Sequence, residues 1–173
     1  GSEERMGKAL EQGNLRDKVF LMTKVCARDA KTAQEQLEQS LRRLRTDRLD
    51  LWQFHEMVYD NDPDWVFEKG GMKAALEAQK AGKVRFIGFT GHSDPGAHLA
   101  MLRAYDQWDS ILMPLHVAES HYMSFEQQVL PVAVERGMGI QGMKNFANAK
   151  LLQGLSVKEC LGYVLSLPIH CKA

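Results

Sequence analysis

Short apolar runs alternate with longer amphipathic stretches along most of the chain. Residues 31–45 (KTAQEQLEQSLRRLR) have helix length, with apolar side chains on one helical face and charged side chains on the other. The apolar positions of that face are Ala33, Leu37, Leu41 and Leu44. The next apolar run, 49–55 (LDLWQFH), has the length of a strand. The alternation of amphipathic helical stretches with apolar runs of strand length predicts repeated βα units around a parallel sheet.

We predict five strands, at 19–25, 49–55, 84–90, 110–115 and 139–143. Helices are predicted at 2–12, 31–45, 72–81, 95–105, 124–135 and 156–165. The loop around Asp60 to Asp64 offers another helix start, and Gly82 fits a left-handed cap after residue 81. Strands therefore recur about every 30 residues, as expected of βα repeats.

The chain has 173 residues, which is enough for one domain spanning 1–173. A closed eight-stranded βα barrel needs about 250 residues, so the chain is too short to close one. An open doubly wound sheet of five strands fits the length and is the alternative architecture. No Gly-rich G-x-G-x-x-G turn follows any predicted strand, which counts against that alternative.

Composition narrows the class of protein. Lysine plus arginine equals aspartate plus glutamate, at 22 each, so the basic surface of a nucleic-acid binder is not expected. No stretch approaches the roughly 18 apolar residues of a membrane span, and the polar start resembles no secretory signal. Cys26, Cys160 and Cys171 are widely spaced without a C-x-x-C pair, which favours a reducing cytoplasmic location without disulfides.

In parallel α/β folds, ligands bind at the carboxyl ends of strands. Lys24 ends the first predicted strand inside an apolar run, and His55 ends the second. An imidazole at such a position can donate a proton or hold a carbonyl oxygen. A lysine with its head group in water and a hydrogen-bonded structural histidine remain open as alternatives.

The third and fifth strand ends carry two further groups, Thr90-Gly91-His92 and Met143-Lys144-Asn145. The first group has small donors and acceptors suited to an amide or a phosphate, although turn or helix-cap chemistry explains it equally well. The second places a cation where a phosphate could bind, and a solvated lysine is its alternative. His116, Glu119 and His121 follow the fourth strand, but without a firm third ligand we expect no metal.

Four segments resemble the aldo-keto reductases. Residues 2–10 (SEERMGKAL) resemble their S-E-x-x-(L/M)-G-x-A-L helix, and 20–24 (FLMTK) the strand that ends in the catalytic lysine. Residues 44–55 (LRTDRLDLWQFH) are similar to the segment ending in the active-site histidine, and 80–88 (KAGKVRFIG) to the G-K-(V/I)-R-x-(I/L)-G strand. The resemblance as a whole covers residues 1 to about 165, in the family's order and spacing. The variants GFTGH, MPL and GMK look closest to the bacterial and archaeal predicted-oxidoreductase branch.

The resemblance implies an α/β fold, a (β/α)8 TIM barrel of which about five βα units are present, with the first two strands and the last strand missing. It implies reduction of a small-molecule carbonyl by NADPH or NADH, without a metal. In the family a tyrosine is the general acid, a lysine lowers its pKa, an aspartate pairs with the lysine and a histidine orients the carbonyl. By this resemblance, Lys24 takes the role of the lysine and His55 the role of the histidine. The residues that match cofactor-binding positions are Thr90, Gly91, His92, Met143, Lys144 and Asn145.

Three departures qualify that expectation. The family's aspartate and tyrosine precede the S-E-x-x-x-G helix, and the tyrosines here do not align with that position. These are Tyr59, Tyr105, Tyr122 and Tyr163. Thr90-Gly91 stands where most members have Ser-Asn, and the tail 168–173 does not resemble the family's eighth strand. We therefore expect the chain alone to be inactive, and a nucleotide-binding sensor or regulatory subunit is the alternative function.

Overall fold

The computed structural model describes residues 1–172 and has an α/β fold. These residues form two compact units. The first comprises Gly1–His55 and Asn61–Gly88, and the second comprises Glu56–Asp60 and the chain from Phe89 onward. The expectation of a single domain stays a prediction.

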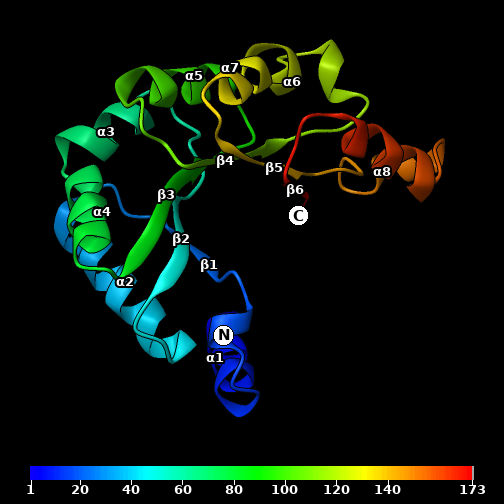
Figure 1. The fold of residues 1–173 in the computed structure, drawn as a ribbon. Coiled ribbons are helices and arrows are strands. Elements are labelled where there is room, and N and C mark those ends of the chain that lie inside the picture. Colours follow the sequence, from blue (N-terminus) through cyan, green and yellow to red (C-terminus); the bar gives the residue numbers. More distant parts are fainter. Residues whose placement is uncertain (173) are drawn as a thin grey trace. The chain divides into compact units, whose positions relative to one another are not determined.

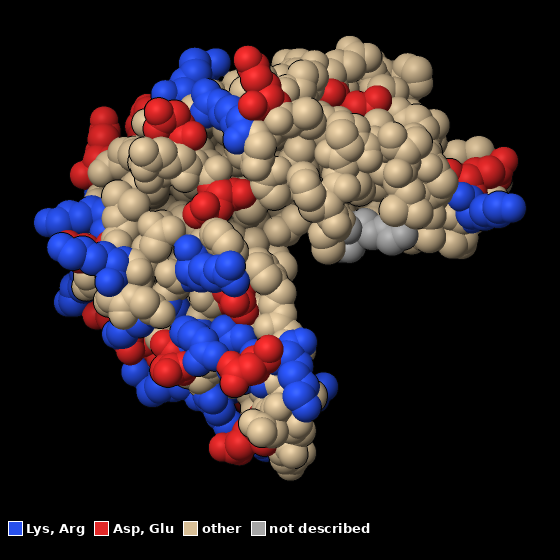
Figure 2. Space-filling model, in the orientation of Figure 1, with Lys and Arg blue, Asp and Glu red and all other residues tan. Residues whose placement is uncertain are grey.

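The first unit alternates helices and strands (Figure 1). Its elements are α1 (Ser2–Gln12), a 3-10 turn (Arg16–Lys18), β1 (Met22–Val25), α2 (Ala30–Leu44), β2 (Leu49–Phe54), α3 (Asp62–Glu68), α4 (Gly71–Lys80) and the first part of β3 (Val84–Thr90). Helices α2, α3 and α4 lie on one side of these strands (Figure 1). Figure 2 shows basic and acidic side chains intermixed over the helices of this unit, as on an ordinary solvent-facing surface.

The second unit continues the same alternation from the end of β3. Its elements are α5 (Pro95–Ala104), β4 (Ser110–Pro114), a 3-10 turn (Glu119–His121), α6 (Phe125–Gln128), α7 (Leu130–Glu135), β5 (Gly139–Met143), a 3-10 turn (Lys150–Gln153), α8 (Val157–Ser166) and β6 (Cys171–Lys172). Helices α5, α6 and α7 lie on one side of β4 and β5 (Figure 1). None of the helices in residues 1–172 has the length and apolar character required to cross a bilayer.

Strand order decides between the two predicted architectures. Hydrogen-bonded neighbours follow chain order, β1-β2-β3-β4-β5-β6, and the pairs β1–β2, β4–β5 and β5–β6 are parallel. A doubly wound sheet reverses its order at a switch point, whereas a βα barrel adds each strand beside the previous one. The strand order is therefore that of a barrel segment, and the alternative prediction of an open doubly wound sheet is wrong.

Helix α2 contributes its apolar face to the core of the first unit, as its sequence pattern predicts. Asp29 caps its start by accepting a hydrogen bond from the Thr32 backbone at 2.9 Å. The predicted apolar face is buried, with Ala33, Leu37, Leu41 and Leu44 all at most 5% exposed. Helix α1 packs closely on α2, because a Cβ added at Gly7 would lie 2.2 Å from the Arg43 carbonyl oxygen.

A cluster of aromatic rings lies in the core of the second unit. Phe89 of β3 packs against Trp108 and against His98 of α5, with ring centroids 5.0 and 5.1 Å apart. His98 also meets Phe125 edge-on at 5.0 Å. The Trp108 indole N–H donates to the Met101 carbonyl at 2.9 Å, so this buried polar group is satisfied.

Three sequence expectations need correction. The helix expected over 124–135 is divided at Val129 into α6 and α7, because Pro131 has no N–H to continue the ladder. The first strand begins at Met22 rather than Val19, since a 3-10 turn precedes it and Phe20 stays 58% exposed. The tail forms a strand after all, β6, which pairs in parallel with β5.

Candidate active site

Lys24 and His55 lie at the carboxyl ends of neighbouring parallel strands. Lys24 of β1 is in register with Gln53 of β2, and the His55 backbone N–H donates to the Val25 carbonyl at 2.8 Å. The ladder therefore extends one step, which brings Cys26 level with His55. Their side chains meet, with Cys26 Sγ 3.5 Å from His55 Nδ1. Because side chains two residues apart share a strand face, Lys24 and His55 point to the same side of the sheet.

Burial distinguishes the two faces of β1. Val25 is fully buried, whereas Lys24 and Cys26 are exposed and His55 is partly exposed. The structure thus gathers a cation, a thiol and an imidazole on one accessible face of the first unit. The sequence predicts Lys24 and His55 as site residues and not Cys26, although Cys26 follows Lys24 by two residues and so shares its strand face.

Thr90 ends β3 in the second unit and acts within the protein. It is 2% exposed, and its Oγ1 accepts a hydrogen bond from the Glu56 backbone at 2.9 Å. The Thr90 carbonyl accepts another from the Met57 backbone at 2.7 Å. The Thr90 hydroxyl therefore holds the segment that follows β2, and its match to a cofactor position stays a prediction.

Gly91 follows, and the structure leaves no room for a side chain there. A Cβ at this position would lie 2.5 Å from His98 Cε1 and 2.7 Å from the Met57 carbonyl oxygen. The Gly91 N–H donates to the Leu112 carbonyl at 3.3 Å. A buried histidine thus occupies the space that a larger residue at position 91 would need.

His98 is a buried neutral imidazole. Its Nε2 lies 3.4 Å from the Leu112 carbonyl, and because a carbonyl only accepts, Nε2 carries the hydrogen. Its Nδ1 is buried without a hydrogen-bond partner among the described residues. Burial lowers the pKa of His98 from 6.5 to about 4, so the ring is uncharged at neutral pH.

A cavity of about 470 Å³ lies in the second unit. Its polar lining includes His92, Ser93, Lys144, Asn148 and Lys150. Two of the predicted cofactor residues therefore meet there, His92 from the end of β3 and Lys144 from the end of β5. Thr90, Gly91, Met143 and Asn145 are not part of the lining.

The residues of this cavity are held by local contacts. His92 Nε2 lies 2.8 Å from Glu56 Oε1, and Lys144 Nζ donates to Asn148 Oδ1 at 3.2 Å. Lys144 has a left-handed backbone, with φ of 59°, which turns the chain as it leaves β5. Asn145 is 5% exposed and donates to the Leu115 carbonyl at 3.0 Å, so it ties the ends of β4 and β5 together.

Among the possible metal ligands after β4, Glu119 binds the backbone of α6. Glu119 lines the cavity but accepts hydrogen bonds from the backbone of Phe125 and, at 3.1 Å, of Glu126. It therefore caps the start of α6. Burial raises its pKa, and burial lowers the pKa of His116. Within residues 1–172, no group of three His, Cys, Asp or Glu side chains has the geometry to hold a metal ion.

Comparison with known proteins identifies the family of the chain. The model of the aldo/keto reductase family matches residues 1–158. The chain belongs to this family. Aldo-keto reductase YhdN of Bacillus subtilis is 34% identical over 148 residues, which cover 76% of this chain and 40% of that relative. The uncharacterized oxidoreductase YrpG of the same organism is 33% identical over 132 residues, which cover 73% of this chain and 37% of that relative. This chain thus spans about 40% of the length of these relatives.

Solved structures show the same fold. The holo form of an aldo-keto reductase from Bacillus halodurans superposes with a TM-score of 0.69 at 26% identity, covering 85% of this chain and 47% of that one. An aldo/keto reductase from Klebsiella pneumoniae in complex with NADP and acetate gives 0.71 at 25% identity, covering 89% and 52%. The chain therefore has the fold of part of the family's (β/α)8 barrel.

Proposed function

We propose that the protein containing this chain transfers a hydride from NADPH or NADH to a small-molecule carbonyl. The observation that carries the proposal is the placement of Lys24 and His55 on one accessible face, at the carboxyl ends of β1 and β2. Barrel enzymes carry out their chemistry at this end of the strands. Family membership, together with the NADP named for the Klebsiella relative, supports the same reaction class.

Lys24 and His55 have different roles in this proposal. The Lys24 ammonium is exposed at the strand end, where its charge would lower the pKa of a neighbouring proton donor. The His55 ring is held beside Cys26, and it would donate a hydrogen bond to the carbonyl oxygen and so orient it. Both roles are electrostatic and need a fixed geometry rather than a metal.

The cavity of the second unit fits a phosphate-bearing cofactor. Lys144 and Lys150 supply positive charge, and Ser93, His92 and Asn148 supply hydrogen-bonding groups. The two lysines would hold phosphate oxygens, while the neutral polar groups would bind amide or hydroxyl groups. The nicotinamide supplies the hydride when it is bound.

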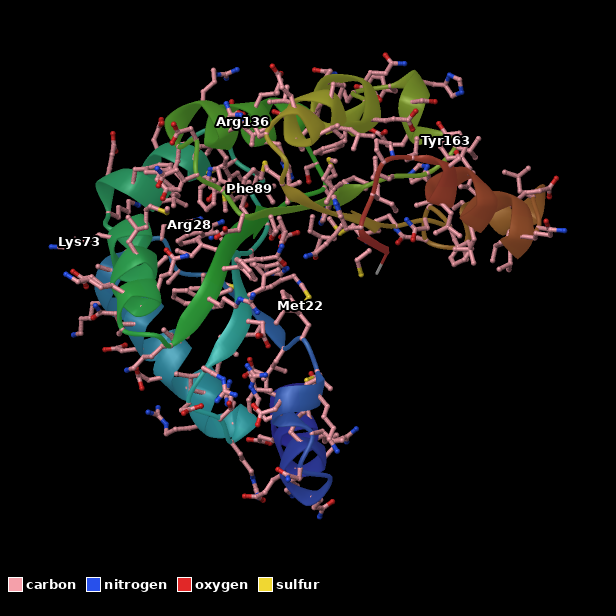
Figure 3. All side chains as sticks on the ribbon, in the orientation of Figure 1. Met22, Arg28, Lys73, Phe89, Arg136 and Tyr163 are labelled. Atoms are coloured by element: carbon pink, nitrogen blue, oxygen red, sulfur yellow. The ribbon has the colours of Figure 1, made fainter. Side chains whose placement is uncertain are left out.

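The test is turnover by the full-length protein. A panel of aldehydes and ketones is incubated with NADPH or NADH, and consumption of the reduced cofactor is recorded. Lys24→Met should lower kcat by about 10²-fold or more, the usual range for loss of an electrostatically stabilising group in an active site. Lys73→Met is the matched control, because Lys73 is an exposed lysine on the outer helix α4 (Figure 3).

The control should retain full activity. If Lys24→Met kept the activity of the unmodified protein, the proposed role of Lys24 would be wrong. If the protein bound NADPH tightly but reduced no carbonyl in the panel, the sensor or regulatory alternative would replace the reductase.

A further inference from the structure

One arginine joins the two strand ends that carry the candidate catalytic residues. Arg28 follows β1 by three residues, and its Nη1 donates to the Cys26 carbonyl at 3.0 Å. Its Nη2 donates to the His55 carbonyl at 2.9 Å, and its Nε donates to Asp62 Oδ1 at 3.0 Å. Figure 3 labels Arg28 beside β2 and β3, on the side of the helices α3 and α4. A single planar guanidinium therefore contacts the residues that directly follow β1 and β2, and the first residue of α3.

The two carbonyls that Arg28 binds lie just beyond the last hydrogen bond between β1 and β2. The β1–β2 ladder ends with the bond from the His55 N–H to the Val25 carbonyl. The carbonyls of Cys26 and His55 come next, and two acceptors cannot bond to each other. A guanidinium has several donors in one plane, so it can bind both carbonyls at once and fix their spacing.

Burial makes the contact a rigid one. The side chains of Arg28 and Asp62 are 12% and 6% exposed, so the ion pair is largely shielded from water. Asp62 is the first residue of α3, where the helix dipole favours a negative charge. Separating the two partners would leave a buried charge uncompensated, which is costly. The ion pair therefore opposes any loosening of the strand ends.

We infer that Arg28 is a positioning residue, which fixes the His55 imidazole on the face that it shares with Lys24. This inference rests on the proposed function, since it assigns a purpose to that geometry. Arg28 acts through the backbone of His55 and needs no contact with the substrate. Because a displacement of about 1 Å can cost about 10²-fold in rate, a carbonyl clamp next to His55 bears directly on catalysis.

The chain provides a matched control in Arg16, near the amino ends of the same strands. Arg16 pairs with Asp50 at 3.0 Å and donates to the carbonyls of Val19 and Arg48, with side-chain exposures of 17% for both members of the pair. It has the same bonding pattern without contacting His55. Arg28→Lys and Arg16→Lys each keep the charge and remove the planar fork.

Both variants are made in the full-length protein, and unfolding, kcat, cofactor affinity and the pH profile of kcat are measured. We expect similar losses of stability in both. Only Arg28→Lys should lower kcat, by about tenfold or more, and shift the pH profile, with cofactor affinity unchanged. Equal effects of the two variants on kcat, or no effect of Arg28→Lys, would overturn the inference.

A second readout does not depend on turnover. The NMR titration midpoint of the His55 imidazole, and the alkylation rate of the Cys26 thiol against Cys171, should change in Arg28→Lys and stay constant in Arg16→Lys. If the unmodified protein reduces no carbonyl but these signals shift, the proposed function fails and the positioning by Arg28 stands. If turnover is robust and neither kcat nor these signals respond, Arg28 has only a structural role.

Discussion

At the residue scale, His98 shows how packing decides the state of a titratable side chain. Its ring is enclosed by Phe89 and Phe125 and lies against Gly91. The sequence shows only a histidine in an apolar helix, and we made no prediction for it. The structure makes it a neutral core residue that limits position 91 to glycine.

Acid should destabilise the protein through His98. Its folded pKa of about 4 lies below the ordinary 6.5, so the unfolded state binds more protons between these values. The stabilising effect of the neutral ring is complete above pH about 6.5 and is lost as pH falls toward 4. The loss should be about 2 kcal/mol at pH 5, from 1.36 kcal/mol per pKa unit.

Urea unfolding at neutral pH and at pH about 5 checks this expectation. The His98→Phe variant removes the titrating group and should lose less stability on acidification than the unmodified protein. His121→Gln is the control, because His121 is exposed, and its acid response should match that of the unmodified protein. Parallel acid responses in all three proteins would contradict the assignment.

At the element scale, strongly periodic segments were predicted well. The helix over 2–12 and the strands over 84–90 and 139–143 were predicted with the observed bounds. The errors fell where backbone chemistry overrides the apolar pattern. Pro131 divides a continuous amphipathic stretch, and β6 is too short for any period to show. Its pairing depends on β5, far away in sequence.

The contact of α1 with α2 gives a prediction at this scale. In a helix, Gly→Ala normally stabilises by up to about 1 kcal/mol. Gly7→Ala should do the opposite and cost about 2 kcal/mol, because its Cβ would overlap the backbone of Arg43. Gly162→Ala in α8 is the control, since a Cβ there meets nothing within 4 Å and should be neutral or stabilising. Thermal unfolding compares the two, and a stabilising Gly7→Ala would contradict the close packing.

At the scale of the whole molecule, the order of the strands and the family membership agree on part of a (β/α)8 barrel. We propose that residues 1–173 alone reduce no carbonyl with NADPH, because none of their tyrosines aligns with the proton donor of the family. The measurement is cofactor consumption by the purified 173-residue chain with the same panel of carbonyls. Robust turnover that disappears in Lys24→Met would contradict this expectation.

The sequence by itself determined the alternation of helices and strands, the buried face of α2, and the strand ends at which Lys24 and His55 lie. These properties depend on local periodicity, which neighbouring residues encode. Only the tertiary structure decided that Cys26 meets His55, that Arg28 bridges two carbonyls, and that Thr90 and Asn145 serve the backbone. Such contacts join residues about 30 positions apart, because hydrogen bonds between strand ends form only after the strands have paired.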